Sequence, residues 1–213
     1  MKINQDKFSY YLGLTIMAIR GTIYQLLRLR FRGLLLLETG GKIYGLGNLQ
    51  FFGVLKVGRY AVLDVRFCVE AVVGNRFSLG DFSILRASGS SKFVSPYIRI
   101  GSGVTFGPYS NIGGGYGLDI GDNCLFGPYV SIHPEEHIFS DIIIPVRSQG
   151  IRGLGIKIET NNWFGAKSTI LDGAMISSGC IFGAGSLIKS GAYPKNIIYA
   201  GVPVKKIKYR DTQ

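Results

Sequence analysis

The chain has 213 residues, of which 46% are apolar, so it can bury one sizeable core and a fully disordered chain is excluded. Its formal net charge of +11 is concentrated at the two ends. Residues 1–32 and 189–213 each hold six basic residues and one acidic residue, whereas twelve basic residues face eleven acidic ones between them. This uneven charge excludes a surface that is basic throughout, so no nucleic acid partner is expected.

The cysteines and histidines limit the chemistry further. Cys68, Cys124 and Cys180 are an odd number at wide spacing, which predicts neither a disulfide framework nor a zinc site. Only His133 and His137 are present, so one chain cannot supply three histidine ligands, and no metal is expected. No cleavable signal peptide is evident. These features together favour a reducing compartment, the cytoplasm.

The first predicted element is a helix over residues 8–32, within an N-terminal amphipathic segment that we place at residues 1–42. Its apolar stripe and its basic side consist of Leu12, Ile16, Ile19, Ile23 and Leu27, and of Arg20, Arg28 and Arg32. Two interpretations stay open: the helix lies on an anionic membrane surface, at the inner face, or it packs on the domain or on a neighbouring subunit. Its apolar stretches are too short for a membrane-spanning helix.

An internal repeat of six residues begins at about residue 43. In its clearest stretch, a large apolar residue recurs every six positions and a small or polar residue follows four positions later. The large residues are Ile158, Phe164, Ile170, Ile176, Phe182 and Ile188, and the small ones are Asn162, Ser168, Ala174, Cys180 and Ser186. Neither a helix nor a simple strand has this period, whereas short strands separated by tight corners do.

Three such steps make one coil of about eighteen residues, so the repeat predicts an all-β solenoid over residues 43–200. Phe164 and Phe182 are expected to stack one coil apart, and so are Ile170 and Ile188. Cys124 and Cys180 occupy the small inward position and are expected to be structural. A basic C-terminal tail is expected at residues 201–213.

One segment breaks the repeat, since 26 residues separate Ile132 from Ile158. We expect residues 133–157 to leave the solenoid as a long loop. Long excursions from a regular fold are usually functional, and both histidines of the chain are in this one.

Five segments in this order resemble the hexapeptide-repeat acyltransferases, most closely the O-acetyltransferases of bacterial capsule, lipopolysaccharide and exopolysaccharide. They are residues 131–139 (SIHPEEHIF), 145–150 (PVRSQG), 161–166 (NNWFGA), 182–186 (FGAGS) and 200–205 (AGVPVK). The resemblance implies a left-handed parallel β-helix and a homotrimer whose sites lie between adjacent subunits. It also implies acetyl-CoA as donor, and a sugar or lipid-linked oligosaccharide as acceptor.

The same resemblance implies the roles of individual residues. One histidine would act as general base: His137 lies in an H-x-F pattern and is preferred, while the His-Pro pair of His133 is the alternative. Trp163 would lie at the active site. The donor would contact backbone groups and phosphate-binding lysines: Gly165, Ala166, Ala184, Lys189, Lys205 and Lys208. Where the family often reads Thr-Lys, this chain has Lys189-Ser190, which puts the position of that phosphate contact in doubt.

Three functions therefore remain open at this point. The preferred one is an O-acetyltransferase acting on a sugar of a surface polysaccharide or its precursor. The second is a serine or nucleotide-sugar acyltransferase of the same fold. The third is a non-catalytic β-helix scaffold, which would not need an off-register loop carrying two histidines. The sugar, its hydroxyl and the length of the acyl chain are not specified by the sequence.

Overall fold

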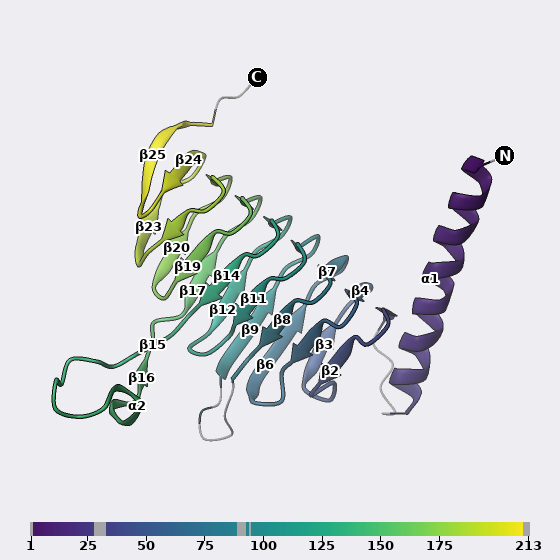
Figure 1. The fold of residues 1–213 in the computed structure, drawn as a ribbon, viewed down its shortest axis with the longest axis horizontal. Helices are drawn as coiled ribbons and strands as arrows, with labels where there is room; N and C mark the ends of the chain where they lie inside the picture. Colours follow the sequence, from purple (N-terminus) through teal and green to yellow (C-terminus); the bar gives the residue numbers. More distant parts are fainter. Residues whose placement is uncertain (1, 28–32, 89–92, 94, 211–213) are drawn as a thin grey trace.

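The chain begins with one long helix and continues as short strands that wind through three sheets in rotation (Figure 1). The structure is a computed structural model that describes residues 2–27, 33–88, 93 and 95–210. The helices are α1 (Lys2–Leu26) and the single turn α2 (Val146–Gln149). Within the described part of the chain, neither combines the length and apolarity that crossing a membrane would require.

Successive strands fall into the three sheets in turn. The first sheet contains β1 (Leu34–Leu37), β4 (Val54–Val57), β7 (Phe77–Leu79), β10 (Thr105–Phe106), β13 (Leu125–Phe126), β18 (Trp163–Phe164), β21 (Ile181–Phe182), β24 (Ile197–Gly201) and β25 (Val204–Tyr209). The second contains β2 (Lys42–Tyr44), β5 (Val62–Asp64), β8 (Ile84–Arg86), β11 (Asn111–Gly113), β14 (Ser131–His133), β19 (Thr169–Leu171) and β22 (Leu187–Ile188). The third contains β3 (Leu49–Phe51), β6 (Cys68–Val73), β9 (Ser95–Ile100), β12 (Leu118–Ile120), β17 (Ile156–Ile158), β20 (Ala174–Ile176) and β23 (Gly191–Tyr193).

Each strand pairs in parallel with the strands one circuit before and after it, apart from the antiparallel last strand β25. Figure 1 shows the circuits stacked side by side along the molecule. The chain is thus mostly β, as predicted. The rotation of strands among three parallel sheets is the pattern expected of a three-sided β-helix.

The core is a set of columns that run through the stacked circuits. In the first sheet the rings of Phe106, Phe126, Phe164 and Phe182 stack face to face, with successive centroids 4.3, 4.6 and 4.9 Å apart. The predicted partners Phe164 and Phe182 are in register, and so are Ile170 and Ile188. The stacking expected from the six-residue repeat is therefore confirmed.

The small residues of the repeat are buried at the corners between sheets. Asn162, Ser168, Ala174, Cys180 and Ser186 are all at most 1% exposed. Cys68 and Cys124 are likewise buried and free, and burial raises the pKa of the Cys124 thiol to about 11. The cysteines are therefore packing residues, as the repeat indicates.

The boundaries expected from the sequence differ from the structure at both ends. The sheets begin at β1, eight residues after the end of α1 and before the expected start at residue 43. The early circuits are longer than the later ones, so a count in steps of six does not identify them. Leu37 pairs with Val57 and Val57 with Leu79, which are 20 and 22 residues apart, whereas Phe164 and Phe182 are 18 apart. Residues 204–209 of the expected C-terminal tail form β25, while residues 28–32 of the expected helix lie outside the described residues.

Helix α1 packs on the first circuit with a face other than its apolar stripe. Met17 is buried, Gly21 lies so close to the backbone of Leu35 that any side chain there would clash, and the Tyr24 hydroxyl donates to the carbonyl of Ile43. The predicted stripe remains exposed on the helix: Leu12, Ile16, Ile19, Ile23 and Leu27. The helix thus has one face for its own domain and one unoccupied apolar face.

Aromatic side chains line one corner between the first and second sheets. Tyr60, Phe82, Tyr109 and Tyr129 all have φ between 51° and 60°, in the left-handed region that residues other than Gly rarely adopt. Their rings stack in sequence, with centroids 5.0 to 5.6 Å apart. This stacking offsets the backbone cost of placing large residues at these positions.

Candidate active site

The loop excursion leaves the second sheet after β14 and returns at β17. Its two arms pair as an antiparallel ladder of β15 (Glu136–His137) and β16 (Ile151–Arg152). Asp141 Oδ1 accepts hydrogen bonds from the backbone of Ile143 and Ile144, and Gln149 Nε2 donates to the carbonyls of Asp141 and Ile144. The excursion is therefore an ordered structure with its own hydrogen bonds.

Two side chains fix the excursion to the stacked sheets. Both oxygens of Asp172, directly after β19, accept from the Leu154 backbone N–H, and Oδ1 also accepts from that of Gly155 at 2.8 Å. The Tyr116 hydroxyl donates to the carbonyl of Ile151 at 2.9 Å. These bonds hold the returning arm, and with it β15, in place against the stacked sheets.

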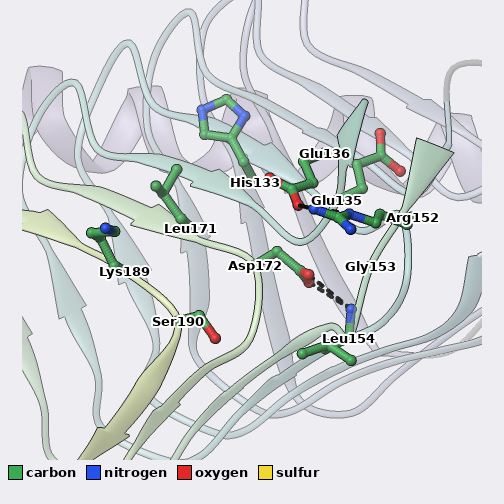
Figure 2. A pocket seen from close by; sticks show the side chains of 10 residues that line it. All are labelled: His133, Glu135, Glu136, Arg152, Gly153, Leu154, Leu171, Asp172, Lys189 and Ser190. Atoms are coloured by element: carbon green, nitrogen blue, oxygen red, sulfur yellow. Dashed lines mark hydrogen bonds and ion pairs between the residues drawn. The ribbon is translucent and has the colours of Figure 1, made fainter. Parts of the chain in front are cut away.

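A pocket of about 440 Å³ lies between the base of the excursion and the end of the second sheet (Figure 2). Its wall consists of His133, Glu135, Glu136, Arg152, Gly153, Leu154, Leu171, Asp172, Lys189 and Ser190. The ion pair between Arg152 Nη2 and Glu136 Oε1, at 2.6 Å, ties the two arms together at the rim. Arg152 and Asp172 could not be recognised from the sequence, because their importance comes from contacts across the excursion.

His133 is the last residue of β14 and contributes to this wall. Its Nε2 makes a short hydrogen bond with the Ser131 hydroxyl on the same strand. The surrounding chain removes water from the imidazole, which lowers the pKa of His133 below its usual value, although part of the ring stays exposed. His133 is therefore a neutral, partly engaged ring at neutral pH.

His137 lies on β15, opposite Ile151, and is exposed. It is not part of the wall that the described residues form around the pocket. His137 interacts electrostatically with the carboxyl group of Glu135, which lines the pocket. Burial raises the pKa of Glu135, and the charge of His137 acts in the opposite direction. The excursion thus places a carboxylate between the pocket and the more exposed histidine.

The donor-binding candidates lie at a different corner, between the first and second sheets. Gly165 and Ala184 are in backbone contact across neighbouring circuits, and Ala166 follows Gly165. In the next circuit, Lys205 and Lys208 of β25 pair with Ala200 and Ile198 of β24. Trp163 is half exposed on the outer face of the first sheet, in register with Leu125 and Ile181. The structure therefore brings these candidates together along one edge.

Lys189 does not join that group, since it lines the pocket beside His133. The histidines and the donor candidates are separated by the width of the second sheet. In one circuit this is the path from Lys167 to Leu171, about 13 Å of extended chain. One copy of the chain therefore does not unite all the candidate residues in one site.

No cluster of three or more potential metal-ligating side chains occurs among the residues that the structure describes. Acid–base chemistry at the histidines and carboxylates of the excursion is what the arrangement can support.

Part of the chain is similar in sequence to known acetyltransferases. No protein-family model matches the chain. A probable acetyltransferase of Mycobacterium tuberculosis is 30% identical over 138 residues, which cover 65% of this chain and 44% of that protein. The galactoside O-acetyltransferase of Escherichia coli is 32% identical over 133 residues, covering 56% and 62% respectively. The chain thus spans less than two thirds of the length of either relative.

The chain resembles the hexapeptide-repeat acyltransferases, as its sequence predicted. A shorter match, 35% identical over 65 residues, is to a putative lipopolysaccharide biosynthesis O-acetyl transferase of Escherichia coli, covering 30% of this chain and 33% of that protein. Among solved structures, a variant of AntD, an N-acyltransferase from Bacillus cereus in complex with dTDP-4-amino-4,6-dideoxyglucose and coenzyme A, has the same fold. It superposes with a TM-score of 0.61 over 89% of each chain at 22% identity.

Proposed function

We propose that this protein is an O-acetyltransferase that moves an acetyl group from acetyl-CoA to a sugar hydroxyl of a bacterial surface polysaccharide or its precursor. The observation that carries the proposal is the ordered excursion. It brings His133 and Glu135 into the wall of a pocket and carries His137 on the adjoining strand β15, on a repeat fold shared with acyltransferases. The relatives that match in sequence are acetyltransferases, one of them acting on galactosides. The proposal includes a left-handed β-helix, as the family resemblance implies.

The chemistry needs one base and one anion-stabilising donor. In the proposed reaction, His137 accepts the proton of the sugar hydroxyl, and the oxygen forms a bond to the thioester carbonyl carbon. A backbone N–H at the corner between the first and second sheets, where the donor-binding candidates lie, stabilises the oxyanion. The C–S bond then breaks, and the proton on His137 passes to the leaving sulfur. Glu135 would orient the imidazole, since it is the carboxylate that interacts with it.

His137 is preferred over His133 because its ring is available. His133 Nε2 is already engaged with the Ser131 hydroxyl, whereas His137 is exposed on β15, which is paired with β16. His133, with its lowered pKa, would form the neutral wall of the acceptor pocket.

The donor would lie along the corner formed by Gly165, Ala166 and Ala184. Gly165 is buried there against the backbone of Ala184, while Ala166 and Ala184 present only methyl groups toward solvent, which would let a pantetheine arm approach closely. Trp163 would contact the donor or the acceptor from the first sheet. Lys205 and Lys208 follow at the end of the same edge, where ammonium groups would meet the phosphates of CoA. Lys189, at the histidine pocket, would meet the acceptor or the donor from the other side.

A homotrimer would unite the two groups of residues. Because the histidines and the donor corner of one copy lie on opposite edges of the second sheet, a neighbouring copy must supply one of them. A closed ring of three identical contacts would give three equivalent sites.

The test of this function is release of free CoA thiol from acetyl-CoA by the purified chain. The assay would use a panel of acceptors: galactosides, other simple sugars, nucleotide-linked amino sugars, serine and cell-derived oligosaccharides. We expect turnover with sugars that carry a free hydroxyl and none with serine. Turnover confined to the amino sugars would contradict the O-acetyl assignment, and absence of acetyl-CoA binding would favour a scaffold.

The exposed stripe of α1 is proposed to lie on the cytoplasmic face of an anionic membrane, where lipid-linked sugars are found. The α1 segment carries Lys2, Lys7 and Arg20 against the single acid Asp6, which matches the charge of such a surface. We expect the chain to sediment with vesicles that contain anionic lipid. Replacing Ile16, Ile19 and Ile23 by serine should release it from them while CoA turnover on a soluble sugar continues. Equal sedimentation of the two forms would contradict the proposal.

A further inference from the structure

The outer face of the second sheet carries a continuous column of residues that passes through His133. Each member follows a buried core residue of the sheet, and strand register connects them. Tyr44 pairs with Asp64, Asp64 with Arg86, Arg86 with Gly113, and His133 with Leu171. Gly113 and His133 occupy the same position of paired strands, since Ile112 is in register with Ile132. Stacked positions of this kind face the same direction, so Arg86 and His133 share one face.

Arg86 belongs to a small cluster with a net positive charge. Asp64 is buried, and its two oxygens are already bonded to Arg66, at 3.0 Å from Nε and 2.8 Å from Nη2. Arg86 Nε is 3.8 Å from Asp64 Oδ2, beyond hydrogen-bond distance. The neighbouring arginines lower the pKa of Asp64, so it is ionised at neutral pH, and one acid faces two bases.

Both guanidinium groups are available to a ligand. The side chains of Arg66 and Arg86 are 51% and 49% exposed, while that of Asp64 is 4% exposed. Arg66 is held in place by Asp64 and by the ring of Tyr44, 4.6 Å away. The cluster therefore presents one preorganised and one weakly engaged guanidinium to solvent, which is the arrangement that binds a phosphate group well.

Arg86 lies close enough to His133 for one ligand to contact both residues. Two strand spacings separate Arg86 from His133, which is about 10 Å. The position between them is Gly113, which contributes no side chain of its own, and the ring of Pro134 borders the column there, with its Cδ 3.1 Å from where a Cβ of Gly113 would stand. The space is comparable with the span from a diphosphate to a ring hydroxyl of the sugar attached to it.

We propose that Arg86 and Arg66 form a subsite for the diphosphate of an activated sugar, whose ring extends past Gly113 to the histidine pocket. The inference rests on the proposed sugar acetyltransferase function and narrows it to an anionic acceptor. A nucleoside diphosphate or a lipid diphosphate would present the same group to the two arginines. The acceptor sugar would then be modified before its transfer to a polymer.

The first experiment measures binding, not turnover. Isothermal titration would follow dTDP-glucose and inorganic pyrophosphate binding to the intact chain, to Arg86→Gln and to Arg86→Lys. The control is Arg59→Gln, an exposed arginine paired with Asp81 at another corner. We expect Arg86→Gln to weaken binding of both probes at least tenfold, Arg86→Lys to weaken it less, and Arg59→Gln to leave it unchanged. Thermal unfolding of each variant would verify that it is folded.

The second experiment separates this inference from the function on which it rests. CoA release would be measured with methyl glucoside, with dTDP-glucose and with a prenyl-diphosphate-linked glucose in vesicles. Arg86→Gln should lose turnover with the two diphosphate acceptors and retain it with methyl glucoside. Unchanged probe affinity in Arg86→Gln, or no probe binding to the intact chain, would overturn the subsite. Probe binding that depends on Arg86 without turnover of any acceptor would overturn only the acetyltransferase function.

Discussion

Replacing His137 by alanine should lower kcat for acetyl transfer about 10²–10⁴-fold, the usual loss when a general base is removed. The thioester is already activated, so deprotonation of the acceptor hydroxyl is the step that most needs help from a side chain. Because His137 is exposed on a paired strand, the variant should fold normally. The measurement is initial-rate release of CoA thiol at saturating acetyl-CoA, with thermal unfolding as the check on folding.

The matched control is His133→Ala, which removes the other histidine of the same excursion. As a wall residue it should mainly raise the KM for the acceptor, with a much smaller effect on kcat. If the larger loss of kcat follows His133→Ala, the base is the His-Pro pair. The pH dependence of activity would then identify His133 as the base by an independent measurement. A base must be unprotonated, so activity would rise through an apparent pKa below the ordinary histidine value, because burial lowers the pKa of His133.

The regular part of the fold was predictable because its physics is local and repeated. Large residues such as Phe164 must pack on the equivalent residue of the next circuit, here Phe182. Because each circuit has three sides of about six residues, this requirement appears in the sequence as a period of six. Small buried residues, Cys180 among them, recur with the same six-residue period. A break in such a pattern is equally visible, which is why the excursion at residues 133–157 was predicted to leave the sheets.

The first circuits were harder to recognise because their corners hold extra residues. Leu79 and Phe106 are register partners 27 residues apart, so no six-residue count connects them. The aromatic corner adds to this, because large stacked rings at Tyr109 and Tyr129 occupy a tight corner with positive φ, where the residue type itself gives no sign of a turn. Strand β25 turns back antiparallel on β24, and nothing in a repeat predicts a reversal of direction.

In the candidate site, too, some features could be predicted from the sequence and others could not. His133, His137 and Trp163 were found as residue types at unusual places in the pattern, which one sequence can reveal. The position of Lys189 in the histidine pocket, and of Arg86 two strands from His133, depends on which residues share a corner. Corners are set by register between distant circuits, so these relations become visible only in three dimensions.

The other large effect should appear when two inactive variants are mixed. Ala184→Trp would fill the donor corner from a position exposed to solvent, and it should abolish turnover as fully as His137→Ala does. If the site joins the excursion of one copy to the donor corner of its neighbour, co-refolded mixed trimers contain sites in which both residues are native. In an equal mixture of a ring-shaped trimer, about a quarter of the sites should be native, with turnover restored to match.

The control for this experiment is the double variant, in which His137→Ala and Ala184→Trp are combined in one chain and mixed with His137→Ala. No site in that mixture contains a native histidine, so turnover should stay absent. Light scattering would give the oligomeric state of each sample. A trimer that shows no recovery in the first mixture would place the whole site within one chain. Because one copy holds the histidines and the donor corner about 13 Å apart, that result would require the excursion to move toward its own first sheet during the reaction.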